Sequence, residues 1–117
     1  MKSLLLVAIG GIAGTLVRFA LSLVIPNDRT GTLAANLIGV ALASALLVLM
    51  ERRDTPELRH LLLPGFCAGM TTFSAVTVQV FEPASGGALF LAENVLLSLL
   101  IVIIVLPISR KFIPVHN

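Results

Sequence analysis

The sequence contains no tryptophan, no tyrosine and a single cysteine, Cys67, among its 117 residues. One cysteine excludes a disulfide within the chain. Charged residues are also scarce at 12% of the chain, whereas hydrophobic residues make up 57% and the mean hydropathy is +1.05. Because a water-soluble domain carries about 25% charged residues, this composition predicts an integral membrane protein.

The residue types that most enzyme chemistry needs are missing as well. There are only two histidines, and no group of His, Cys, Asp and Glu has the spacing of a transition-metal site. The sequence contains neither a glycine-rich phosphate loop nor a recognisable nucleophile with a positioned base. We therefore expect neither enzyme activity nor a nucleic-acid partner.

Four apolar stretches are long enough to cross a bilayer, which takes about 20 residues of helix. The segments between them hold prolines, glycines or charged residues, which are typical helix stops. The predicted spans are 3–25, 31–50, 61–81 and 88–108. The sequence thus predicts an all-α membrane protein, a single four-helix transmembrane subunit over 1–117.

The third span contains a run of small and polar residues, Gly65-Phe66-Cys67-Ala68-Gly69-Met70-Thr71-Thr72-Phe73-Ser74. Lipid cannot satisfy a free backbone carbonyl or N–H group. Such a run in mid-membrane therefore predicts a helix that breaks and restarts, which is tolerated where the exposed backbone is buried in protein or lines an ion site. We expect this break to be the functional centre.

The first two spans carry packing signals and one polar residue. Gly10 and Gly14 lie four residues apart, as do Ala35 and Gly39, and small residues at this spacing allow close helix contact. Asn36 lies inside the second span, where an amide must find partners. It can serve as a structural hydrogen-bonding residue or present its two N–H donors to an anion, and the residues alone leave both roles open.

Positive charge is unevenly distributed. In a protein with an even number of spans, the two termini and the second loop share one side of the membrane. That side carries Lys2, Arg52, Arg53, Arg59, Arg110 and Lys111, whereas the other side carries Arg29 and at most Arg18. The positive-inside rule then predicts that both termini face the cytoplasm.

Several motifs together resemble the Fluc or CrcB family of fluoride channels. They are the glycines at 10–14 followed by Arg18, the segment 31–39 around Asn36, and the run 65–74. The fourth span matches mainly at Asn94-Val95. A lone pair of glycines would be a weak signal, but the asparagine motif combined with Thr71-Thr72-Phe73-Ser74 is specific.

This resemblance implies a passive, fluoride-selective channel in the bacterial plasma membrane that exports cytoplasmic fluoride and reduces its toxicity. Two subunits would pack antiparallel, with a sodium ion between their broken third helices. The sodium ion would be held by backbone carbonyls of Ala68 and Thr71. The pore-lining candidates, which offer N–H or O–H donors, a ring edge or positive charge to an anion, are Asn36, Phe73, Thr72, Ser74, Thr77 and Arg18.

The sequence also departs from the family pattern. Val76 replaces a phenylalanine, Ala68 a glycine, and Ile101-Val102 a polar Gly-Ser pair. An antiparallel homodimer needs one sequence to insert in both orientations, which the charge bias disfavours. We therefore expect a heterodimer with a homologous, oppositely oriented subunit; a homodimer is the alternative. In the heterodimer, Asn36 and Phe73 serve one pore. Val76 and Val102 line the other pore, which is expected to be vestigial.

Two other classes of function compete with a channel. A small multidrug-type transporter would need a carboxylate within the membrane to couple protons, and the span 3–25 contains none. A non-conducting structural or assembly subunit would explain the small-residue packing and the missing polar positions without an ion path.

Overall fold

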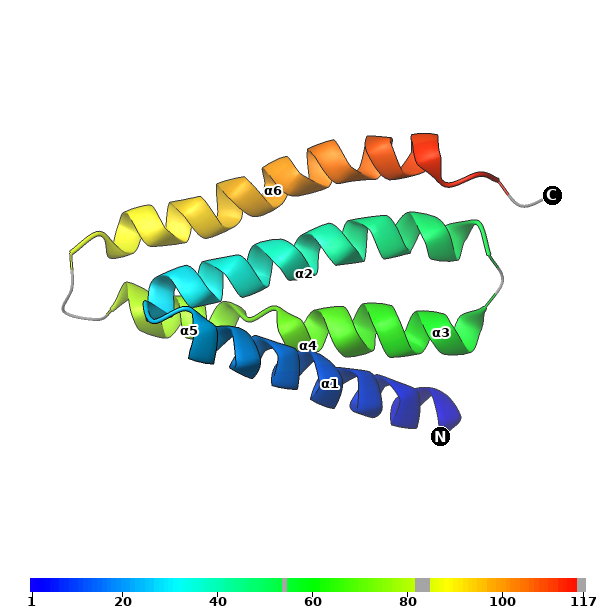
Figure 1. Cartoon of the computed structure of the whole chain (residues 1–117), viewed down its shortest axis with the longest axis horizontal. Helices are drawn as coiled ribbons and strands as arrows, with labels where there is room; N and C mark the ends of the chain where they lie inside the picture. Colours follow the sequence, from blue (N-terminus) through cyan, green and yellow to red (C-terminus); the bar gives the residue numbers. More distant parts are fainter. Residues whose placement is uncertain (54, 82–84, 116–117) are drawn as a thin grey trace.

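The computed structural model describes residues 1–53, 55–81 and 85–115, and four long helical units lie side by side in it (Figure 1). Their elements are α1 (Lys2–Val24), α2 (Asp28–Glu51), a segmented third unit, and α6 (Gly87–Phe112). The third unit consists of α3 (Pro56–His60), the π-helix η1 (Leu61–Cys67), α4 (Ala68–Met70) and α5 (Phe73–Val80). All four units are long and apolar enough to cross a membrane, as predicted. Residues 82–84, in the segment between the third and fourth predicted spans, lie outside the described residues.

Several helices extend beyond their predicted bounds, for local reasons. The second helix begins at Asp28, because the Asn27 side chain accepts a hydrogen bond from the Thr30 N–H and so caps it. The third begins at Pro56, a residue favoured at the first helical position because its missing N–H would have no helical partner there. The fourth continues past Pro107 to Phe112.

Both termini lie at the same end of the bundle as the turn between α2 and α3 (Figure 1). Two contacts tie this end together. Lys2 Nζ lies 3.3 Å from Glu57 Oε1, and the Arg52 guanidinium donates a hydrogen bond of 2.6 Å to the carbonyl of Ile113. The basic residues of the termini and the second loop therefore gather at one end of the molecule, as the charge argument assumed.

The backbone of α1 packs directly on the third unit. A Cβ atom at Gly10 would collide with the carbonyl oxygen of Leu61, and one at Gly14 with the carbonyl oxygen of Phe66. A Cβ atom at Gly69 would in turn collide with the carbonyl oxygen of Gly11. The predicted small-residue face of α1 is thus confirmed as a surface of close backbone approach.

The third unit also contacts α2 along its length, and its segment α5 contacts α6; in the view of Figure 1, α2 lies between the third unit and α6. Ala35 is completely buried, and a Cβ atom at Gly39 would lie 2.5 Å from Cγ2 of Thr71. The small residues of α2 therefore bring this helix against the segment of the third unit where its helix ends.

The third unit is interrupted at Thr71 and Thr72. Both have extended backbone, with φ −86° and ψ 153° at Thr71 and φ −151° and ψ 121° at Thr72. Helix resumes at Phe73. The predicted break is confirmed and is only two residues long, whereas Gly65, at the start of the predicted run, lies within η1.

Gly14→Ala should destabilise the protein, because the added methyl group must displace the backbone of the third unit. Forcing atoms into a packed interior costs about 1–3 kcal/mol. Gly11→Ala is the matched control, since its Cβ atom would lie 3.9 Å from the nearest carbonyl oxygen, that of Gly65. Thermal unfolding in detergent should show a clearly lower melting temperature for Gly14→Ala and an unchanged one for Gly11→Ala. Equal melting temperatures for the two variants would contradict the close contact of α1 with the third unit.

Candidate ion site at the helix break

The side-chain amide of Asn36 pairs with the backbone of the break. Its Nδ2 donates to the carbonyl of Thr72 over 3.1 Å, and its Oδ1 accepts from the Thr72 N–H over 2.7 Å. Asn36 is only 8% exposed. The amide thus gives Thr72 the two hydrogen bonds that the interrupted helix does not supply, which is the requirement for non-helical backbone at membrane depth.

The second N–H of Asn36 is engaged as well. It donates to Oδ1 of Asn94 in α6 over 2.9 Å, and Asn94 Nδ2 donates to the carbonyl of Phe90 over 2.9 Å. Both donors of Asn36 therefore have protein acceptors. The amide thus has the structural role that the sequence left open, and its role toward an anion stays a prediction.

A pair of hydroxyl groups follows the break. Thr72 Oγ1 accepts a hydrogen bond from the Ala75 N–H, which caps α5, and lies 3.2 Å from Oγ of Ser74. Two hydroxyl groups carry two protons, and the bond between them uses one. Neither hydroxyl donates to another acceptor within the described residues, so one O–H remains for a ligand.

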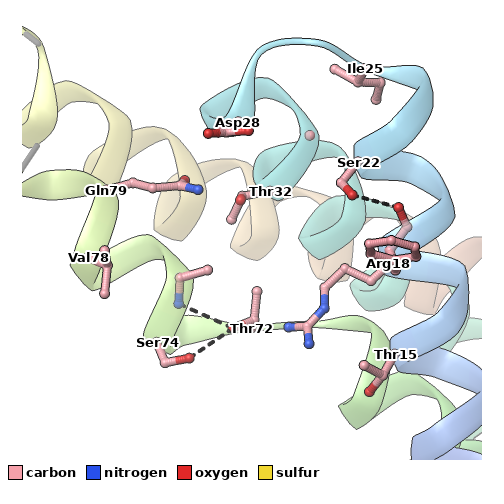
Figure 2. A pocket seen from close by; sticks show the side chains of 13 residues that line it. Thr15, Arg18, Ser22, Ile25, Asp28, Thr32, Thr72, Ser74, Val78 and Gln79 are labelled. Carbon is pink, nitrogen blue, oxygen red and sulfur yellow. Dashed lines mark hydrogen bonds between the residues drawn. The ribbon is translucent and has the colours of Figure 1, made fainter.

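One side of the break opens on a cavity of about 520 Å³ between α1, the start of α2, and α5. Figure 2 shows the side chain of Arg18 extending from α1 into this cavity, with Thr32, Thr72 and Ser74 among its other polar lining residues. Arg18 is half-buried. A cationic group attracts anions, but the carboxylate of Asp28 lines the same cavity, so the role expected for Arg18 stays a prediction.

The other side of the break faces a second cavity of about 380 Å³, against α6. Asn36, Phe73, Val76 and Val102 all line it, and Thr72 lines both cavities. These four residues thus line one cavity of this subunit. The expected division of Asn36 and Phe73 from Val76 and Val102 between two pores of an assembly stays a prediction.

The remaining predicted pore residues are placed differently. The ring of Phe73 is 68% exposed, so it stands at the surface of this subunit. Thr77 donates its hydroxyl proton to the carbonyl of Ser74 over 2.7 Å and lines neither cavity. Phe73 is therefore available to a ligand or a partner, whereas the hydroxyl of Thr77 has a structural partner.

Ala68 and Thr71, predicted to hold sodium, stand at the end of α4. Ala68 has ordinary helical geometry with φ −67°, so its methyl group imposes no strain. Thr71 Oγ1 lies 3.4 Å from the Ala68 carbonyl oxygen, and the carbonyl of Thr71 accepts no hydrogen bond from the described part of the chain. Neutral oxygens at a helix end are ligands suited to a hard cation, so these two residues fit a sodium ion.

Two contributors were missed in the sequence. Arg29, counted there only as a loop charge, donates to the carbonyls of Gln79 over 2.7 Å and Ser85 over 2.8 Å, and its guanidinium lies 5.6 Å from the ring centre of Phe90. It thereby fixes the far end of α5. Asn94 was noted only as part of the resemblance, although an amide inside an apolar span is the same signal that singled out Asn36.

Comparison with known proteins agrees with this architecture. The model of the family described as CrcB-like protein, Camphor Resistance (CrcB), matches residues 5–109. A protein of Chlorobium phaeobacteroides named fluoride-specific ion channel FluC is 40% identical over 101 residues, covering 81% of this chain and 79% of its own. A FluC protein of Rhizobium etli is 37% identical over 121 residues, covering 93% and 97%. These relatives are ion channels and not enzymes, as expected here, and the chain belongs to the CrcB family.

Proposed function

We propose that this chain is a subunit of a fluoride-selective channel, through which cytoplasmic fluoride leaves the cell by passive flow. The observation that carries this proposal is the hydroxyl pair of Thr72 and Ser74, which retains a donor proton beside the break. Fluoride is small and strongly hydrated, so it enters an apolar medium only where hydrogen-bond donors replace its water. The names of the relatives support fluoride as the ion.

The groups around the break have distinct roles in this proposal. Arg18 concentrates anions in the larger cavity, Thr72 and Ser74 offer the hydroxyl donor, and the exposed edge of Phe73 provides a weakly positive rim. Asn36 lines the path and holds its backbone in place. Thr77 supports this segment through the carbonyl of Ser74.

A sodium ion suits the carbonyls of Ala68 and Thr71, with the matching pair supplied by an antiparallel second subunit. Two carbonyls fall short of the oxygen set that a hard cation prefers, and a second subunit would double their number. When bound, such an ion would supply positive charge between the two broken helices. The residues of this chain contribute neutral oxygens only, and their geometry is set by the end of α4.

The second subunit is proposed to be a homologous, separately encoded chain. Six basic residues gather at the end with both termini, against Arg29 and Arg18 elsewhere, which favours one orientation with the termini in the cytoplasm. The partner would insert the other way and cover the exposed ring of Phe73. Val76 and Val102 offer fluoride no hydrogen bond. The surface of the partner subunit that faces these two residues should therefore carry the polar groups.

Fluoride efflux from liposomes tests the channel directly. Vesicles loaded with fluoride and containing this chain together with its oppositely oriented homologue should release fluoride quickly. Vesicles with this chain alone should behave like protein-free vesicles, and chloride-loaded vesicles should show no release. Efflux from the chain alone would overturn the heterodimer, and no efflux from the pair would indicate a non-conducting subunit.

Ser74→Ala tests the donor that carries the proposal. Because it removes one of the two hydroxyl groups, fluoride efflux from the pair should fall by about tenfold, the size of one lost hydrogen bond to a charged group. Ser22→Ala is the control: Ser22 lines the same cavity, but its hydroxyl already donates to the carbonyl of Phe19 over 2.6 Å. Equal efflux from the two variants would refute the role of the hydroxyl pair.

The orientation is testable with reporters fused to the C-terminus. A fluorescent protein that folds only in the cytoplasm should be active, and an alkaline phosphatase that folds only outside should be inactive. Arg52→Gln with Arg53→Gln weakens the bias and should produce a mixed population. If the unaltered chain already shows both orientations in comparable amounts, the argument for a separately encoded partner fails.

A further inference from the structure

Asn94 is a buried polar residue of α6 that connects this helix to Asn36, the residue that pairs with the break. It is 6% exposed, and its only described side-chain partners are Asn36 and the carbonyl of Phe90. We propose that Asn94 is a positioning residue: its amide holds Asn36 in the orientation that pairs with Thr72, and so sets the geometry of the ion path. This inference depends on the proposed function only in the experiments that measure fluoride flux.

The direction of each amide is dictated by backbone groups at the two ends of the chain of hydrogen bonds. The Thr72 N–H is a donor, so Asn36 must turn its oxygen toward it. The Phe90 carbonyl is an acceptor, so Asn94 must turn its nitrogen toward it. The ends that remain, the nitrogen of Asn36 and the oxygen of Asn94, then match as donor and acceptor at 2.9 Å. An amide at position 94 therefore selects one of the two orientations of Asn36.

The hydrogen bond between Asn94 and Asn36 affects the proposed ion path through one residue, Thr72. Asn36 pairs with both backbone groups of Thr72, and the Thr72 hydroxyl lies against Ser74. Without the oxygen of Asn94, a buried N–H of Asn36 loses its acceptor. The Asn36 side chain then rotates toward another acceptor, and its hydrogen bonds to the Thr72 backbone are lost. Asn94 would thereby control the position of the hydroxyl donors without touching the ion.

Asn94→Leu and Asn94→Asp separate this role from simple packing. Leucine has the branched shape of asparagine, with bulkier methyl groups, but accepts no hydrogen bond. A carboxyl group keeps the pattern of the amide only when neutral: its C=O accepts from Asn36 and its O–H donates to the Phe90 carbonyl. Burial in apolar surroundings favours the neutral form of a carboxyl group, so Asn94→Asp should regain the pattern as the pH falls.

The experiment measures fluoride efflux and melting temperature for the reconstituted pair at about pH 8 and about pH 5.5. Protein-free vesicles at each pH correct for leakage of HF. Relative to the unaltered chain, Asn94→Leu should lose about tenfold in efflux at both pH values. Asn94→Asp should also lose efflux at high pH, because its carboxylate cannot donate to the Phe90 carbonyl and is a buried charge, and should return to within about threefold at low pH, in the same preparation.

The outcomes decide between positioning, charge and packing. Asn94→Leu with normal efflux and melting temperature would overturn the inference, because any loss in Asn94→Asp would then come from repulsion of fluoride by a carboxylate. Asn94→Ala, a second neutral variant, replaces the leucine variant if that does not yield a folded sample. Should the unaltered pair not conduct, the proposed function fails, and deuterium exchange of the Thr72 N–H still decides the inference: this N–H should exchange faster in Asn94→Leu if Asn94 positions Asn36, and an unchanged rate would overturn it.

Discussion

The pairing of one side-chain amide with one backbone unit, Asn36 with Thr72, is the interaction on which the rest of this structure depends. An interrupted helix leaves N–H and C=O groups unpaired, and within a bilayer no water is available to them. Asn36 supplies both a donor and an acceptor at 3.1 and 2.7 Å. The extended residues Thr71 and Thr72 can therefore lie at membrane depth, where the Thr71 carbonyl stays outside the helical hydrogen-bond pattern and the Thr72 hydroxyl caps α5 beside Ser74.

The surrounding bundle keeps this pairing in place. On one side, Gly10 and Gly14 let α1 rest on the backbone of the third unit, and on the other, Gly39 lets α2 reach Thr71. The far end of α5 is held by the guanidinium of Arg29 through the carbonyls of Gln79 and Ser85. The broken helix is thus fixed at both ends and supported along its length, which is what a preorganised ion site requires.

The features that could be predicted from the sequence are those encoded locally. Four spans follow from hydropathy, and the break follows from small and polar residues that lipid cannot accommodate. Pairings between distant residues leave no such local trace. The engagement of both N–H donors of Asn36 depends on Asn94, 58 positions away, and on Thr72, 36 positions away. For the same reason the sequence does not show that the Thr77 hydroxyl donates to the carbonyl of Ser74, or that Val76 and Val102 line the same cavity as Asn36.

Exchange of the Thr72 backbone N–H with deuterium, followed by nuclear magnetic resonance in detergent micelles, tests the amide pairing most directly. If Asn36 holds the break, this N–H should exchange slowly, as in a hydrogen-bonded helix, although Thr72 lies outside helical structure. Asn36→Leu should make it exchange faster while leaving the amides of α2 protected. Rapid exchange of the Thr72 N–H in the unaltered protein would contradict the account.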